Sequence, residues 1–153
     1  MKNLSISFFT TFILFGVSVY SNVHAASDWT IPANPGCEVS LGNTTNVHSG
    51  YKASGGTAVI GCPLTKKVAG NNLNHVYARI NRKNANGPDP FCTLNSYSLY
   101  STSNDSKSKN ASKRAGNQSL SIPFPTIYSS GYLSVFCVLN DGDTLHGIRY
   151  GQD

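Results

Sequence analysis

The chain has 153 residues, a formal net charge of +5 and only 12% charged residues, whereas about a quarter is usual in soluble domains. This length suits one domain. The low charge and the abundance of Asn and Ser exclude a coiled coil, a charged disordered tail and a helical bundle of Glu/Lys/Leu composition, and they argue against a strongly electrostatic nucleic-acid binder.

The first 25 residues have the three-part pattern of a secretory signal peptide. Lys2 supplies the positive charge, residues 4–20 are mostly apolar, and Val23-His24-Ala25 places small or aliphatic side chains where a signal peptidase cuts, before Ala26. A retained membrane anchor is the alternative, but Ser and Thr interrupt the apolar run and shorten it. No later stretch is long and apolar enough to span a bilayer. We therefore expect a secreted or periplasmic protein with a single domain at residues 26–153.

The first half of the predicted mature chain mixes turn-rich segments with strands. Residues 26–36 predict an extended leader that docks Trp29 on the body, and residues 42–56 are rich in Asn, Thr, Ser and Gly, which predicts irregular structure. Apolar and polar side chains then alternate with a period of two, which predicts strands rather than helices. These strands are expected at residues 57–64, 73–83 and 91–100.

The second half begins with residues 101–119, which contain no large apolar side chain. We expect a flexible, solvated loop there. Residues 120–128 hold two prolines and predict a short edge strand at most. Residues 131–139 are the most hydrophobic strand, and Asn140-Asp141-Gly142-Asp143 has the chemistry of a hairpin turn before a last strand at residues 144–150.

About six to eight strands separated by turns predict an all-β fold, an antiparallel β-sandwich of Ig-like or jelly-roll-like type. In such a fold, alternate residues of each strand are buried between two sheets. The predicted core consists of Val76, Ala78, Ile80, Cys92, Leu94, Leu133, Val135, Cys137 and Leu139.

An even number of cysteines in an exported chain predicts disulfides. The four cysteines, Cys37, Cys62, Cys92 and Cys137, allow three connectivities. We favour Cys37–Cys62, which would tie down the leader, together with Cys92–Cys137, because both of these residues lie in strand-like runs. A zinc module is not indicated, since there is no Cys-x-x-Cys pair.

Three of the predicted strands carry aromatic or basic side chains opposite their core positions. If these strands share a sheet, the side chains form one face on which rings would stack on a sugar, while Arg79 would orient hydroxyl or carboxylate groups. The alternative is that the leader covers this face, with Trp29 and Tyr51 packing over it. The candidate contact residues are Tyr77, Arg79, Tyr97, Tyr132 and Phe136.

We therefore predict an exported, non-enzymatic binding module for an envelope or host glycan, with a protein partner as the next candidate. A basic cluster within residues 101–119 would attract anionic surfaces weakly. It lacks interleaved aromatic residues, so no specific nucleic-acid binding is expected. Its members are Lys107, Lys109, Lys113 and Arg114.

Two other functions stay open. A secreted inhibitor or effector-type interaction protein would act through a loop, either residues 101–119 or residues 84–90. A small secreted hydrolase would need two opposed carboxylates, for which Glu38 with Asp141 or Asp143 is the available choice. No Gly-x-Ser-x-Gly elbow supports an enzyme.

No cofactor or metal is predicted. The three histidines of the mature chain, His48, His75 and His146, have no ligand spacing, so we expect surface histidines. Asp141-Gly142-Asp143 lacks the further acidic residues that would complete a calcium loop.

From Trp29 onward the chain resembles an uncharacterised family of small secreted bacterial proteins with four cysteines. The features that carry the resemblance are Trp29-Thr30-Ile31-Pro32 before Cys37, Cys62-Pro63-Leu64, Cys92 with Leu94, and the closing Tyr132, Cys137, Leu139, Gly142, Leu145 and Arg149. The resemblance covers nearly the whole mature chain and implies export, two disulfides and an all-β fold. It implies no catalytic residue.

Overall fold

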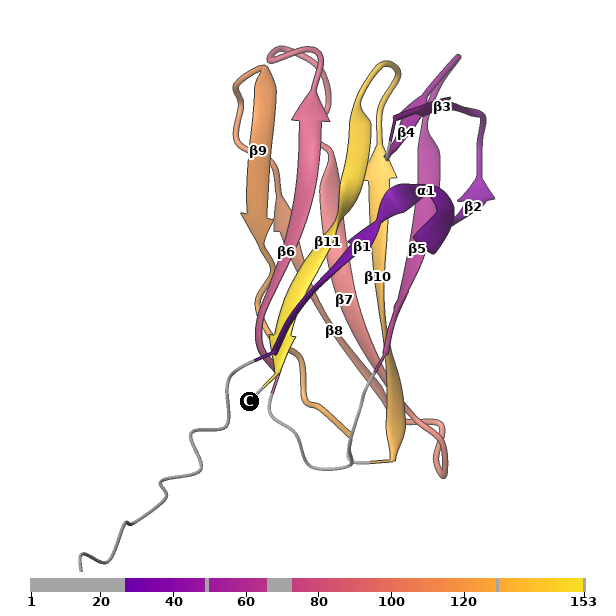
Figure 1. Cartoon of the computed structure of the whole chain (residues 1–153), viewed down its shortest axis with the longest axis vertical. Coiled ribbons are helices and arrows are strands. Elements are labelled where there is room, and N and C mark those ends of the chain that lie inside the picture. Colours follow the sequence, from indigo (N-terminus) through magenta and orange to yellow (C-terminus); the bar gives the residue numbers. More distant parts are fainter. Residues whose placement is uncertain (1–26, 49, 66–72, 129, 153) are drawn as a thin grey trace, which may run out of the picture.

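Two antiparallel β-sheets pack face to face (Figure 1). The computed structural model describes residues 27–48, 50–65, 73–128 and 130–152, so the predicted signal peptide at residues 1–25 lies outside the described residues. The described strands are β1 (Ser27–Pro32), β2 (Glu38–Leu41), β3 (Thr44–Val47), β4 (Gly50–Ala53), β5 (Ala58–Leu64), β6 (Leu73–Arg82), β7 (Phe91–Ser98), β8 (Asn104–Asn110), β9 (Gly116–Ser121), β10 (Gly131–Leu139) and β11 (Thr144–Gln152). One helical turn, α1 (Ala33–Gly36), follows β1. The predicted β-sandwich is confirmed, with more strands than the expected six to eight.

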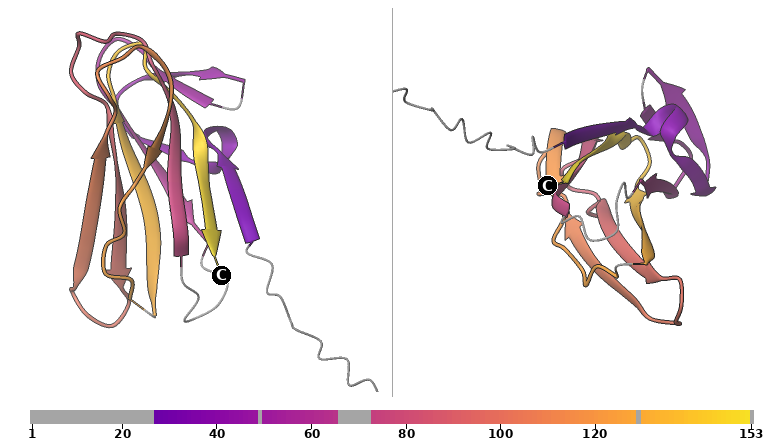
Figure 2. Two further views of the ribbon diagram at one scale, coloured as in Figure 1. Left: turned by 90° about the vertical axis from the view of Figure 1, so that its left-hand side faces the viewer. Right: turned by 60° about the horizontal axis from the view of Figure 1, so that its bottom comes forward.

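The two sheets have different central strands. The β11 sheet has the order β3-β4-β11-β6-β9, with β1 as a further partner of β11, and the β10 sheet has the order β2-β5-β10-β7-β8. β6 pairs along most of β11, whereas β4 pairs with residues 144–145 of β11 and β1 with residues 147–152. The first and last described strands therefore lie side by side, as both views of Figure 2 show.

The core lies between the sheets, and all nine predicted core residues are buried. The period of two is visible in β6, where Val76, Ala78 and Ile80 are buried and the residues between them are more exposed. The extended leader, expected over residues 26–36, is confirmed for residues 27–32 as β1, whereas residues 33–36 form the helical turn α1. Its Trp29 ring lies 5.5 Å from the ring of Tyr150 and packs against the core.

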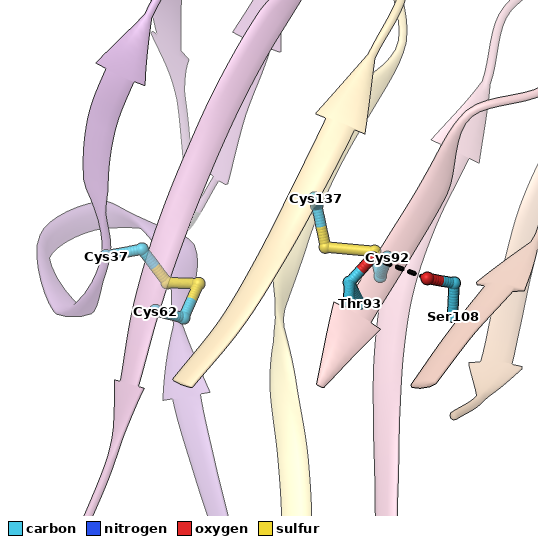
Figure 3. Close-up of a disulfide and its surroundings, with 6 residues drawn as sticks. All are labelled: Cys37, Cys62, Cys92, Thr93, Ser108 and Cys137. Carbon is cyan, nitrogen blue, oxygen red and sulfur yellow. Dashed lines mark hydrogen bonds between the residues drawn. A yellow bond between two sulfur atoms is a disulfide. The ribbon is translucent and has the colours of Figure 1, made fainter. Parts of the chain in front are cut away.

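Both favoured disulfides are present and both lie in the β10 sheet (Figure 3). Cys92 on β7 and Cys137 on β10 are direct cross-strand partners, with Cα atoms 4.1 Å apart. Cys37, between α1 and β2, joins Cys62 on β5, with Cα atoms 4.2 Å apart. Two disulfides fit a protein that folds in an oxidising compartment such as the periplasm or the extracellular space. Among the described residues, no helix is long and apolar enough to cross a bilayer.

The prediction of a flexible loop at residues 101–119 is wrong, because two edge strands occupy most of it. β8 pairs with β7, and β9 pairs with β6. Almost every β8 side chain is exposed, so no apolar alternation marks this strand in the sequence. Lys107 and Lys109 lie opposite Leu94 and Cys92, whose side chains belong to the core. Lysines on the inward side of an edge strand oppose pairing with a second molecule.

Two further expectations about turns are corrected. Residues 42–56, expected to be irregular, contain the β3–β4 hairpin, whose exposed residues gave no strand pattern. Residues 140–143 do not close a hairpin, because β10 and β11 are central strands of different sheets. The turn carries the chain across the sandwich, with Gly142 at a φ of 84°. The buried carboxylate of Asp143 accepts hydrogen bonds from the backbone amides of Lys83 at 2.8 Å and Asn140 at 3.1 Å.

The connection between β6 and β7 is organised by a buried guanidinium. Arg82 is 1% exposed and lies 2.9 Å from a carboxylate oxygen of Asp89. It donates to the backbone carbonyls of Asn84 at 2.8 Å, Gly87 at 2.7 Å and Ser112 at 2.7 Å. The guanidinium therefore holds the 84–90 segment against the turn that follows β8.

Candidate functional site

The structure divides the five predicted contact residues between two faces. Tyr97, Tyr132 and Phe136 lie on the outer side of the β10 sheet, which we call the β10 face. Tyr77 and Arg79 lie on the outer side of the β11 sheet, the β11 face, because β6 belongs to that sheet. The single shared face expected from the sequence is therefore wrong. The alternation shows which residues share one side of a strand, but it does not show which sheet receives the strand.

On the β10 face, Tyr97 and Tyr132 form a stacked pair. The two residues are cross-strand partners on β7 and β10. Their ring centroids are 4.7 Å apart and their planes differ by 15°. The Tyr132 side of the pair is open, since this residue is 52% exposed. The stack therefore presents a flat aromatic surface held in place by a second ring.

A groove of about 470 Å³ runs along β2, β5 and β10 beside this stack. Phe136 lies opposite Gly61 on β5, and a Cβ atom on Gly61 would come within 2.9 Å of its ring. The glycine thus leaves room for the ring beside β5. The groove is lined by Glu38, Ser40, Gly61, Cys62, Pro63, Leu64, Tyr97, Tyr132, Leu133, Ser134 and Phe136.

A buried hydroxyl without a partner belongs to a residue that lines the same groove. Ser134 is 9% exposed, and within the described part of the chain its Oγ has no hydrogen-bond partner. Its cross-strand neighbours are Asn95 on β7 and Pro63 on β5. A buried hydroxyl usually finds a partner within the protein, but this oxygen has almost no exposed area, so Ser134 borders the groove without presenting its hydroxyl to a ligand. Sequence alternation places Ser134 on this face, but its lack of a partner is visible only in the structure.

The three carboxylates considered for a hydrolase are not gathered. Glu38 lines the β10 groove, whereas Asp143 is buried in the 140–143 turn. Asp141 Oδ1 accepts the backbone amide of Gly55 at 2.8 Å. Glu38 is the only carboxylate among the described residues that line this groove.

The histidines are also dispersed, whereas the basic cluster follows one continuous stretch of the chain. Lys107 and Lys109 lie on β8, and Lys113 and Arg114 lie in the turn that leads to β9. His48 follows β3 and is exposed, His75 lies on β6 and His146 on β11. Among the residues that the structure describes, no group of three His, Cys, Asp or Glu side chains is placed to hold a metal ion.

The β11 face contains an ionic cluster centred on Asp28. One Asp28 oxygen accepts a hydrogen bond from Arg149, and the other lies 3.0 Å from Nε2 of His75. The hydrogen bond from Arg149 holds the pKa of Asp28 below its ordinary value, against the opposing effect of desolvation. The same bond raises the pKa of Arg149. The cluster therefore fastens β1 to both β11 and β6.

In comparisons with known proteins, no protein-family model matches the chain, and no curated protein matches it significantly.

Proposed function

We propose that this protein is an exported, non-enzymatic module that binds a saccharide on its β10 face. The observation that carries the proposal is the open Tyr132 ring, stacked on Tyr97 beside a groove that is also lined by Glu38. The two disulfides and the signal-like pattern of residues 1–25 support export.

A sugar ring suits this combination because it has an apolar face and a rim of hydroxyl groups. The apolar face would stack on Tyr132, in the way that amphipathic aromatic residues contact partly apolar ligands. The rim would meet the carboxylate of Glu38 in the groove. The groove volume of about 470 Å³ falls within the range usual for small-ligand sites.

Binding is favoured over hydrolysis by the small number of carboxylates in the groove. Glycoside hydrolysis commonly uses a pair of carboxyl groups on opposite sides of the scissile bond. Among the described residues that line the groove, Glu38 has no second carboxylate with which to form that pair.

The test is a glycan array probed with the purified, oxidised protein and three variants. Tyr132→Ala should abolish saccharide binding, and Tyr132→Phe should retain it, because the ring rather than the hydroxyl forms the stacking surface. Tyr100→Ala is the matched control, since Tyr100 is 85% exposed and does not line the groove. Saccharide binding that survives Tyr132→Ala would refute the proposed site, and a wild-type protein that binds no glycan would point to a protein partner.

A further inference from the structure

Two hollows on the β11 face meet at the same two residues. One, of about 560 Å³, is lined by Arg79, Ile80, Asn117, Gln118, Ser119 and His146. The other, of about 380 Å³, is lined by His75, Tyr77, Arg79, Ser119 and Arg149. Arg79 on β6 and Ser119 on β9 are cross-strand partners and belong to both hollows. The hollows therefore form one extended depression across β11, β6 and β9.

Glycines lower the surface along β11, the central strand of this sheet. Gly147 lies opposite Arg79 and Gly151 lies opposite His75, with Arg149 between them opposite Tyr77. A Cβ atom on Gly151 would come within 2.4 Å of the His75 ring and 2.7 Å of an Asp28 oxygen. Gly151 therefore gives Asp28 and His75 the space in which they meet.

The charges of the face are unevenly compensated. Asp28 is already in contact with both Arg149 and His75. Arg79 is exposed and, among the described residues, forms no ion pair. The Arg79 guanidinium, which lacks a negative partner, thus lies beside Ser119 at the junction of the two hollows. Tyr77 is the next residue on the same side of β6.

We propose that the β11 face binds an acidic polysaccharide, with one oxyanion group of the polymer seated on Arg79 and Ser119. A planar guanidinium binds carboxylate and sulfate groups in a bidentate manner, and a hydroxyl adds a further donor. The two hollows extend to either side of this anchor, which suits consecutive units of a chain, and Tyr77 offers a ring surface to one of them. This site is separate from the β10 face, so either proposal can fail alone.

The experiment measures the affinity of the full oxidised protein for three polymers: polygalacturonate, dextran sulfate and neutral dextran. Arg79→Gln should lower the affinity for the acidic polymer by about tenfold or more, because a charged hydrogen-bonding group is lost. Arg79→Lys should fall between wild type and Arg79→Gln, since it keeps the charge without the planar fork. The control Lys113→Gln removes the same charge from an exposed turn residue outside both hollows and should have little effect.

The outcomes are distinct. Loss with Arg79→Gln but not with Lys113→Gln or Tyr132→Ala supports the site, and the two acidic polymers show whether carboxylates or sulfates are preferred. Equal losses with Arg79→Gln and Lys113→Gln would mean general attraction to a cationic protein and would overturn the proposal. Failure to bind either acidic polymer at low salt, or equal binding of neutral dextran, would overturn it as well.

Discussion

The ring of Phe136 lies beside the bare backbone of its cross-strand partner Gly61, so closely that a Cβ atom there would come within 2.9 Å of the ring. The outline of the β10 groove depends on this contact, because Phe136 and Gly61 both line it.

Gly61→Ala should therefore have a larger effect on the shape of the groove than on the free energy of unfolding. The half-buried ring can turn away, so we expect a destabilisation of about 1 kcal/mol, at the low end of overpacking effects, with a clear loss of saccharide affinity. Gly87→Ala is the control, since its Cβ would meet Asn84 only at 3.6 Å. Thermal unfolding and binding measured together test the expectation, and unchanged binding in Gly61→Ala would contradict the role given to Phe136.

The partnerless hydroxyl of Ser134 predicts a gain in stability when it is removed. Ser134→Ala should stabilise the free protein by about 1 kcal/mol, because it removes a buried polar group that no described residue satisfies. Saccharide binding should change little, because the Oγ atom has almost no exposed area. In Ser96, by contrast, the buried Oγ accepts the backbone amide of Tyr128 at 3.3 Å, so Ser96→Ala should destabilise. Urea unfolding distinguishes the two, and a destabilised Ser134→Ala would show that its hydroxyl is used inside the protein.

Arg82 should be among the least replaceable residues of the sheets. Arg82→Lys keeps a charge but cannot reach Asp89 and the surrounding carbonyls at once. We expect a loss of about 2–3 kcal/mol, because buried carbonyl oxygens are left without a donor. Arg79→Lys, on the exposed side of the same strand, should stay within about 0.5 kcal/mol of wild type. Similar unfolding midpoints for the two variants would refute the anchoring role.

The Asp28 cluster predicts a dependence of stability on acid pH. The pKa of Asp28 is lowered in the folded protein, so its contribution is present above the unfolded value of about 3.9 and is lost as the pH falls through the folded value. Asp28→Asn should melt at a lower temperature than wild type near neutral pH. The difference should vanish in strong acid, and a difference that persists there would indicate a role other than the ion pair.

The core strands were predictable because a strand that is buried on one side has an apolar residue at every second position. Val76, Leu94 and Val135 belong to strands that are buried on one side, and all three are buried as expected. The same alternation continues to Arg82, which is buried on the inward side of β6 although its side chain is charged. The polar edge strand β8 carried no such mark, since its backbone pairing leaves its side chains in solvent.

The candidate site was less predictable because it depends on which strands become neighbours. Tyr97 and Tyr132 meet through the β7–β10 register, whereas Tyr77 lies across the sandwich on β6. The alternation of side chains within a strand does not show which of the two sheets that strand joins. The ion pair of Asp28 with Arg149 joins the first and last described strands, and no local signal predicts such a distant contact.

The place of β11 after all of its partners in the sequence has a consequence for the timing of folding. β1, β4 and β6 all pair with this one strand, so none of these pairings can form until residues 144–152 have been synthesised. Before that point the β3–β4 and β7–β8 pairings can form, but β1, the first described strand, has no native partner. The β11 sheet is therefore completed late, and long-range pairings of this kind form slowly compared with local ones.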